Sequence, residues 1–298
     1  MAKILYGAPV REKIKEELIK KVKKLENKSC LVIVQVGDRE DSNIYIKQKQ
    51  KFGEEIGVKV ILKKFDNDIK EKRLIFEIEK LNKDNEVNGI IVQLPLPNNL
   101  DSKKLIESIE KQKDADGLRE IKDEEEVLVT PATAKAVMTL LDFYNIEVKD
   151  KKIAVIGRSR LAGGPIAEVL KERGVAVKVC YKEMDVEEIK NICRESDILI
   201  SAAGQARLVT KEFVNKDQVV IDVGINRPHP SLRVDPLLVK EREGQTKPSL
   251  PKLVGDVNFN EVEPIVSAIT PVPGGIGPLT VGCLFENLLD LCYTNHIT

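Results

Sequence analysis

The stretch KIAVIGRSRLAGGP, residues 152–165, decides the fold, because it passes from a buried strand through a glycine-rich turn into a helix. A turn without bulky Cβ atoms at this point lets a phosphate group approach the helix N-terminus. The usual dinucleotide pattern is Gly-x-Gly-x-x-Gly, whereas here Ser159 replaces the second glycine and the later glycines are Gly163 and Gly164. Taken alone, Gly157 and its neighbours leave a nucleotide site and an ordinary strand–helix turn equally open.

Strand-like and helix-like segments alternate on both sides of this stretch, which is typical of parallel sheets joined by crossover helices. We therefore predict a two-domain α/β protein that includes a Rossmann-type doubly wound parallel sheet. The predicted strands are 30–36, 58–65, 89–92, 152–156, 175–180, 197–202 and 218–223. The predicted helices are 10–25, 42–56, 70–81, 133–144, a helix from the glycine-rich turn to about 173, and 279–293.

Two irregular segments interrupt the alternation. The charged segment 119–126 predicts a domain boundary. Segment 227–252 carries five prolines and few periodic apolar positions, which predicts a long surface loop.

Composition excludes several classes of protein. The 298 residues include 48 Lys+Arg and 48 Asp+Glu, with seven Phe, five Tyr and no Trp. A net charge of zero without a basic block argues against binding to nucleic acid. The apolar runs are far shorter than the roughly 20 residues that span a bilayer, so no membrane association is expected. The N-terminus resembles no signal or transit peptide, and we expect a cytoplasmic location.

Cysteine and histidine usage limits the chemistry. The five cysteines are scattered, mostly in apolar runs, and are predicted to be core thiols. Two histidines offer neither a zinc site nor a Ser/His/Asp triad, so no metal is expected. Proton transfer in an enzyme of this sequence would use Lys, Asp, Glu, Tyr or water.

The predicted helix 42–56 places a lysine on an inward-facing stripe. Tyr45, Lys49, Phe52 and Ile56 recur at helical spacing, so the first two share a face with apolar residues. Burial disfavours the ammonium form and makes a lysine a usable proton acceptor near neutral pH. The alternative is that Lys49 snorkels, with its stem on apolar surface and its charge in water.

Further polar residues stand where active sites of α/β proteins occur, beyond the carboxyl ends of strands. Gln93 follows a predicted strand directly, and Asp116 precedes a glycine in what also looks like a simple turn. The run 271–278, PVPGGIGP, is the most constrained stretch of the chain. It is compatible with a ligand contact or with a rigid hinge.

The end of the strand after the glycine-rich turn reports on the cofactor. A cation there accommodates the 2′-phosphate of NADP, whereas an acid accepts a hydrogen bond from the ribose of NAD. Lys182 together with Arg158 favours NADP, and Glu183 keeps NAD open. Exposed loop charges with no ligand are a third interpretation.

The chain as a whole resembles the bifunctional methylenetetrahydrofolate dehydrogenase/methenyltetrahydrofolate cyclohydrolase family. The motifs that carry the resemblance occur in order along nearly the whole chain. They are Val36-Gly37-Asp38, Ser42 with Tyr45 and Lys49-x-Lys51, VQLPLP at 92–97, KDADG at 113–117, Gly157-Arg158-Ser159, DVGIN at 222–226, Gly255-Asp256-Val257 and TPVPGGIGP at 270–278.

The resemblance implies a folate domain of residues 1–120, completed by a C-terminal helix in 272–298, and a Rossmann domain of residues 121–271, with the site in the cleft between them. It implies catalytic roles for Lys49, Gln93, Asp116 and Tyr45, with Lys49 central and oriented by Gln93. The implied folate-binding residues are Tyr45, Gln93, Asp116, Pro271, Gly274 and Gly275. The implied cofactor-binding residues are Gly157, Arg158, Ser159, Lys182, Gly204, Ile225 and Thr270.

The family's chemistry would need few groups and no metal. A hydride passes from 5,10-methylenetetrahydrofolate to NADP or NAD, and water then opens the methenyl product to 10-formyltetrahydrofolate with Lys49 relaying protons. The resemblance also implies a homodimer.

The chain departs from the family pattern at three places, and alternatives stay open. Residues 131–134 read PATA, which lacks a second proline, and Lys182 stands where the family often has a serine. The loop 227–252 is also longer than the family pattern, and no function is assigned to it. The alternatives are another Rossmann dehydrogenase, a family member with one activity, and a dinucleotide-binding regulator without turnover.

Overall fold

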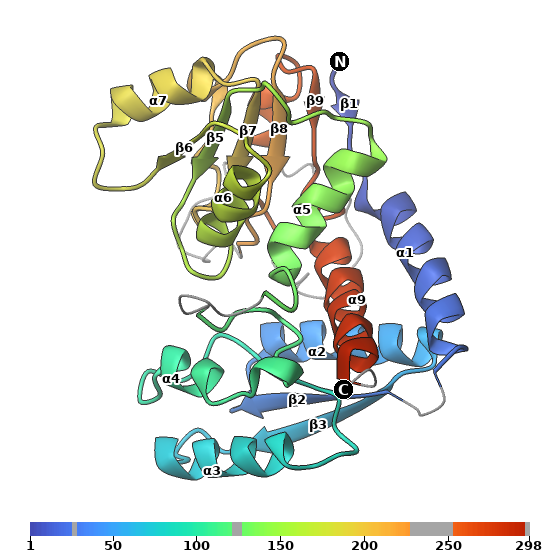
Figure 1. Ribbon diagram of the computed structural model, residues 1–298. Coiled ribbons are helices and arrows are strands. Elements are labelled where there is room, and N and C mark those ends of the chain that lie inside the picture. The colour runs from blue at the N-terminus through green and yellow to red at the C-terminus, as the bar shows by residue number, and fades with distance from the viewer. Residues whose placement is uncertain (26–28, 121–126, 227–252, 296–298) are drawn as a thin grey trace, which may run out of the picture. The chain divides into compact units, whose positions relative to one another are not determined.

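A computed structural model describes residues 1–25, 29–120, 127–226 and 253–295 (Figure 1). These residues form two compact units, each built around a parallel sheet. The three-strand unit contains the described residues of Ala8–Thr139 and Pro278–Thr298, and the six-strand unit those of Met1–Gly7 and Leu140–Gly277. Compactness alone does not define a functional domain, so the domain bounds predicted above stay a prediction.

The three-strand unit has the strand order β3-β2-β4, with all pairs parallel. Its strands are β2 (Cys30–Val36), β3 (Lys59–Phe65) and β4 (Gly89–Val92). Its helical elements are α1 (Gly7–Val22), α2 (Glu40–Ile56), α3 (Glu71–Asn82), α4 (Ser102–Glu107) and the 3-10 turn η1 (Lys111–Lys113). Every residue of β2 is buried because both faces of the sheet are covered.

Different helices cover the two faces of this sheet. On one face, Val32 and Val34 of β2 pack in a cluster with Leu74 of α3 and Leu105 of α4. Helices α2 and α9 (Gly277–Asn295) meet through Phe52 and Phe285, whose ring centroids lie 5.4 Å apart. Gly89 in β4 allows a close approach, because a Cβ there would lie 2.4 Å from the Leu288 side chain. Helix α9 therefore packs directly against β4.

The six-strand unit has the parallel strand order β1-β9-β8-β7-β5-β6. Its strands are β1 (Lys3–Ile4), β5 (Ile153–Ile156), β6 (Val177–Cys180), β7 (Ile198–Ser201), β8 (Val219–Asp222) and β9 (Ala268–Ile269). The helical elements that follow these strands are α6 (Gly163–Glu172), α7 (Val186–Arg194), η2 (Lys211–Phe213) and α8 (Phe259–Val262), while α5 (Ala132–Phe143) precedes β5. Figure 1 shows α6 lying across one face of the sheet.

The chain changes direction in this sheet at β5. From β5 it passes to β6 on one side, and it then returns to β7 on the other side. Ligands of open α/β sheets bind beyond the carboxyl ends of the strands at such a switch point. The topology therefore directs attention to the residues after β5 and β7.

The structure confirms the predicted α/β class and the predicted strands and helices, with ends that differ by a few residues. The predicted core thiols are also confirmed, since all five cysteines are buried. The sequence interpretation missed the two-residue strands β1 and β9, whose partners are distant in sequence, and the helices α4, α7 and α8. The predicted loop 227–252 lies outside the described residues.

None of the helices in the described part of the chain is both long and apolar enough to cross a membrane. In the same residues, no three His, Cys, Asp or Glu side chains gather in a way that could hold a metal ion.

Candidate active site

Helix α2 presents Tyr45 and Lys49 on one face, one turn apart. Phe52 and Ile56 on the same stripe are buried, and Lys49 and Tyr45 are partly buried. The Nζ atom of Lys49 donates a hydrogen bond to Oε1 of Gln93 at 3.0 Å. The amine of α2 is thus held at the carboxyl edge of the three-stranded sheet.

Gln93 is the first residue after β4, and its own orientation is fixed. Its backbone N–H continues the sheet by donating to the Val34 carbonyl at 2.8 Å. Its side-chain Nε2 donates to the Leu94 carbonyl at 2.8 Å. Because the amide nitrogen is engaged there, Oε1 is the atom that faces Lys49, and Gln93 orients the amine without adding a charge.

The charges of Lys49 and Asp116 depend on each other. Burial lowers the pKa of the Lys49 amine, and the negative charge of Asp116 opposes this effect. Burial likewise raises the pKa of Asp116, and the positive charge of Lys49 opposes that change. An amine whose ammonium form is disfavoured in this way gives up its proton more readily than an exposed lysine does, which suits it to proton transfer.

The loop that carries Asp116 is held by its neighbour Asp114. The Asp114 carboxylate accepts hydrogen bonds from the backbone N–H groups of Gly117 at 3.2 Å and Arg119 at 2.8 Å. Burial and, to a smaller extent, the charge of nearby Asp116 raise the pKa of Asp114 to about 6, against the opposing effect of the Arg119 N–H. Gly117 has φ +68°, a conformation that favours glycine.

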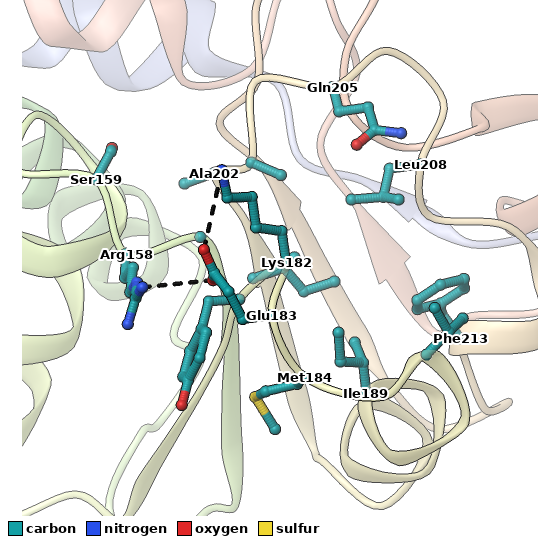
Figure 2. A pocket seen from close by; sticks show the side chains of 15 residues that line it. Arg158, Ser159, Lys182, Glu183, Met184, Ile189, Ala202, Gln205, Leu208 and Phe213 are labelled. Atoms are coloured by element: carbon teal, nitrogen blue, oxygen red, sulfur yellow. Dashed lines mark hydrogen bonds and ion pairs between the residues drawn. The ribbon is translucent and has the colours of Figure 1, made fainter.

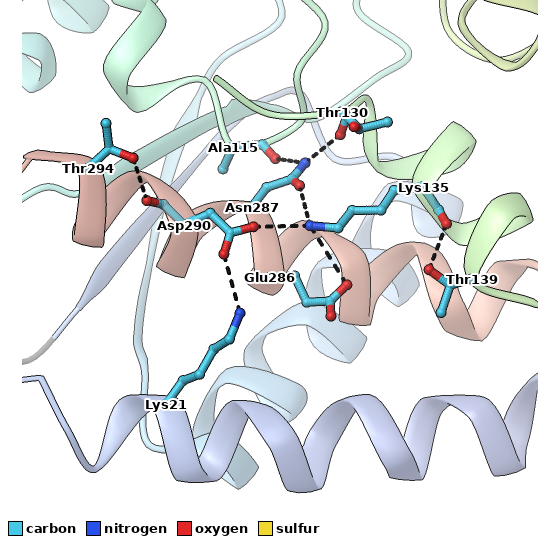
Figure 3. Close-up of polar contacts among 9 residues, drawn as sticks. All are labelled: Lys21, Ala115, Thr130, Lys135, Thr139, Glu286, Asn287, Asp290 and Thr294. Atoms are coloured by element: carbon cyan, nitrogen blue, oxygen red, sulfur yellow. Dashed lines mark hydrogen bonds and ion pairs between the residues drawn. The ribbon is translucent and has the colours of Figure 1, made fainter. Parts of the chain in front are cut away.

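Asn287 of α9 also holds the loop that carries Asp116, through hydrogen bonds to its backbone (Figure 3). This fully buried residue donates from Nδ2 to the carbonyl oxygens of Ala115 at 3.1 Å and Thr130 at 2.8 Å. Its Oδ1 accepts from Nζ of Lys135 at 3.1 Å, and Lys135 also forms an ion pair with Asp290 at 3.1 Å. The sequence interpretation missed Asn287, although a lone asparagine in an apolar helix is a usable signal.

A second candidate site, a pocket of about 710 Å³, lies in the six-strand unit (Figure 2). It is lined by the predicted cofactor residues Gly157, Arg158, Ser159 and Lys182 and by residues of the loop after β7. Figure 2 shows Met184, Ile189, Leu208 and Phe213 forming its apolar part.

The glycine-rich turn leaves no room for a side chain at Gly157 or Gly163. Gly157 has φ +106°, and a Cβ there would lie 2.3 Å from the Ala202 carbonyl oxygen. A Cβ on Gly163 would lie 2.1 Å from the Gly157 carbonyl oxygen. The turn therefore exposes backbone at the N-terminus of α6. This arrangement suits the phosphates of a dinucleotide, although the sequence of the turn differs from Gly-x-Gly-x-x-Gly.

Charged groups also line the pocket. The guanidinium of Arg158 lies 3.4 Å from the Glu183 carboxylate and 4.2 Å from the centre of the Tyr181 ring. The Lys182 amine lies 3.9 Å from the same carboxylate (Figure 2). One acid thus partners both cations that could meet a 2′-phosphate.

The remaining predicted residues lie in loops of the six-strand unit. Gly204 follows β7, Ile225 follows β8, and Thr270 follows β9. None of the three is among the described residues that line the pocket. Pro271, Gly274 and Gly275 lie in the loop after β9, where the Gly274 carbonyl accepts a hydrogen bond from the Gly7 N–H at 2.7 Å.

Two family models match the chain. Residues 5–116 match the tetrahydrofolate dehydrogenase/cyclohydrolase catalytic domain, and residues 131–296 match the NAD(P)-binding domain of the same family. The bifunctional protein FolD 2 of Lactobacillus johnsonii is 36% identical over 303 residues, covering 99% of each chain.

Solved structures of similar proteins agree over the full length. The bifunctional enzyme FolD of Campylobacter jejuni is 34% identical with a TM-score of 0.86, covering 99% of this chain and 100% of that chain. The methylenetetrahydrofolate dehydrogenase-cyclohydrolase of Trypanosoma brucei, complexed with NADP and an inhibitor, is 31% identical with a TM-score of 0.88, covering 100% of this chain and 99% of that one.

Proposed function

The chain belongs to the tetrahydrofolate dehydrogenase/cyclohydrolase family, and we propose that Lys49 is its central catalytic residue. It is a bifunctional enzyme that oxidises 5,10-methylenetetrahydrofolate with NAD(P) and hydrolyses the methenyl product. The observation that supports the role of Lys49 is its 3.0 Å hydrogen bond to Gln93, which presents a partly buried amine in a fixed direction.

In the dehydrogenase reaction, the folate carbon between N5 and N10 loses a hydride. The two nitrogens share the resulting positive charge, so alignment of the reactants supplies most of the rate acceleration. The bound nicotinamide cofactor supplies the hydride acceptor. We assign the pterin contact to Asp116 and the wall of the folate site to Tyr45, Pro271, Gly274 and Gly275.

In the cyclohydrolase reaction, water attacks the methenyl carbon, and the carbon–N5 bond then breaks. Of the two water protons, one is released and the other reaches N5 as the ring opens to 10-formyltetrahydrofolate. Lys49 takes the proton from the attacking water, which requires the neutral amine that burial favours. Gln93 keeps this amine pointed at the reacting carbon.

We propose NADP as the preferred cofactor, because the pocket presents the cations Arg158 and Lys182 where an extra phosphate would be bound. Gly157 and Ser159 of the glycine-rich turn would hold the pyrophosphate, and Gly204, Ile225 and Thr270 the nicotinamide half. Glu183 is the feature that supports NAD instead. A homodimer and a cytoplasmic location, both predicted from the sequence, remain proposals.

The experiment compares Lys49→Ala and Lys49→Arg with the unchanged enzyme. Hydrolysis of isolated methenyltetrahydrofolate is followed by absorbance, with the uncatalysed rate subtracted, and the dehydrogenase reaction is assayed with NADP and NAD in parallel. We expect both variants to lose cyclohydrolase activity by roughly 10²- to 10⁴-fold, the usual contribution of general base catalysis.

The matched control is Lys47→Ala, which removes an exposed lysine from the same helix. It should retain both activities. Full cyclohydrolase activity in Lys49→Ala would refute the proposed role.

A further inference from the structure

One buried carboxylate joins two loops of the six-strand unit. Asp256 is fully buried, and its Oδ2 accepts hydrogen bonds from the backbone N–H groups of Ala203 at 2.7 Å and Gly204 at 3.1 Å. The Ser201 hydroxyl donates to the same oxygen at 3.3 Å, and Oδ1 accepts from Nδ2 of Asn226 at 2.8 Å. Residues at the end of β7 and in the loops after β7 and β8 therefore donate hydrogen bonds to the same side chain, that of Asp256.

The surrounding chain leaves space for this carboxylate and for little else. A Cβ on Gly224 would lie 2.1 Å from Oδ1 of Asp256, so a residue with a side chain at position 224 would displace it. Buried carboxylates are costly unless they are fully hydrogen-bonded. The four donors around Asp256 meet that requirement.

A second buried acid, Asp222, extends the arrangement to the loop after β9 through both its carboxylate and its backbone N–H. Asp222 accepts from the backbone N–H groups of Gly224 at 3.0 Å, Asp256 at 3.0 Å and Val257 at 2.9 Å. Its own backbone N–H donates to Oγ1 of Thr270 at 2.7 Å. The loops that hold Gly204, Ile225 and Thr270 are thus connected through two buried acids.

The loop bound by Asp256 forms part of the pocket wall. Ala202, Ala203 and Gln205 line the pocket, and the Ala202 carbonyl lies against the Gly157 turn. Asp256 itself is not among the described lining residues. The N–H groups of Ala203 and Gly204 donate two charge-assisted hydrogen bonds to Asp256, which does not itself line the pocket. Such bonds are about twice as strong as neutral ones.

We propose that Asp256 is a positioning residue for the dinucleotide, which it acts on only through the 203–204 backbone. The inference rests on the proposed cofactor pocket. Without the carboxylate, the N–H groups of Ala203 and Gly204 lose their acceptor, and this wall of the pocket is no longer fixed. Loss of Asp256 should therefore weaken cofactor binding, while the cyclohydrolase reaction, which consumes no cofactor, continues.

The experiment uses Asp256→Asn and Asp256→Ala, with Ser201→Ala as the matched control. The control removes one donor to the same carboxylate and leaves both backbone contacts in place. The KM for NADP and for NAD is measured in the dehydrogenase assay. The Kd of the dinucleotide is measured by fluorescence titration. The kcat/KM for methenyl hydrolysis is measured without cofactor.

We expect the dinucleotide Kd and KM to rise roughly tenfold in Asp256→Asn and further in Asp256→Ala. Cyclohydrolase kcat/KM should stay within about twofold, and Ser201→Ala should bind the cofactor normally. If Asp256→Ala fails to fold, Asp256→Asn, which keeps an acceptor and the same shape, decides the question.

Unchanged cofactor binding in Asp256→Asn would overturn the proposal. A parallel loss of both activities would also overturn it, because it would indicate a general structural role. If the unchanged protein binds neither dinucleotide, the result contradicts the proposed cofactor pocket itself, and the inference about Asp256 is rejected together with it.

Discussion

Nζ of Lys49 and Oε1 of Gln93 are 3.0 Å apart, and the acceptor in this pair carries no charge. Its amide nitrogen is bound to the Leu94 carbonyl, so the oxygen cannot rotate away from the lysine without losing that bond. The nearby charge that acts on the amine comes from Asp116. Lys49 thus has a neutral partner, Gln93, that orients its amine, and a charged neighbour, Asp116, that partly offsets the effect of burial on its pKa.

Gln93→Glu should shift the pH dependence of methenyl hydrolysis to higher pH. A second carboxylate beside Lys49 favours the ammonium form and raises the pKa that burial has lowered. We expect the rising limb of kcat/KM to move up by roughly one to two pH units. The comparison variant Gln48→Glu adds the same charge at an exposed position of α2, and an equal shift there would contradict the explanation.

Glu183→Gln should increase the preference for NADP over NAD. The substitution removes the carboxylate partner of Arg158 and Lys182 and the charge that repels a 2′-phosphate. Since these groups are exposed, we expect the ratio of kcat/KM values for NADP and NAD to rise only about three- to tenfold. Glu187→Gln, at the start of α7, should leave the ratio unchanged, and a falling ratio in Glu183→Gln would count against an NADP site.

Asn287→Leu should raise the folate KM in both reactions and leave the cofactor KM unchanged. The variant removes the two hydrogen bonds to Ala115 and Thr130, so the loop before Asp116 loses its attachment to α9. The free energy of unfolding should fall by about 1–3 kcal/mol, as expected for buried acceptors left unpaired. Thr294→Ala, which breaks only a bond within the same helix, is the control. An unaltered folate KM would exclude a positioning role for Asn287.

Asp114 should make the folded state less stable as pH rises from about 4 to 6. Burial raises its pKa from 3.8 to about 6, so the folded protein binds this proton more tightly than the unfolded chain does. Its stabilising contribution is therefore complete below pH 4 and is lost as pH rises through 6. The effect is on the order of 2–3 kcal/mol.

Denaturant titrations of the unchanged protein and of Asp114→Asn across pH 4–7 measure this contribution. The difference in unfolding free energy between the two proteins should decrease with rising pH, and Asp84→Asn, in an exposed loop, should show no such trend. A difference that increases with pH would mean that the Asp114 pKa is lowered instead.

Elements with a strong local pattern could be predicted from the sequence. Strand Cys30–Val36 is apolar except for Gln35, and strand Gly89–Val92 is closed by prolines, so both were predicted with the bounds observed. Strands β1 and β9 have two residues each, and they form because β9 pairs with β8 on one side and with the distant β1 on the other. No local pattern encodes such a pairing.

The candidate site was predictable where chemistry and spacing coincide. Lys49 stood out because a lysine on an apolar stripe needs an explanation, and Gln93 because it follows a strand. Asp256 and Asn287 were not predicted as functional residues, because their importance comes from backbone groups of other segments that only the fold brings to them. Hydrogen bonds to distant main-chain atoms leave no trace in the spacing of side chains.

The pairing of Lys3–Ile4 with Ala268–Ile269 also bears on how the protein is made. During synthesis, Lys3–Ile4 is made more than 260 residues before its partner strand Ala268–Ile269. The three-strand unit is also completed late, because most of α9 is synthesised after Leu140–Gly277 of the other unit. Such distant contacts slow folding. Neither unit is one uninterrupted segment, so cutting the gene at any single point cannot release either unit whole.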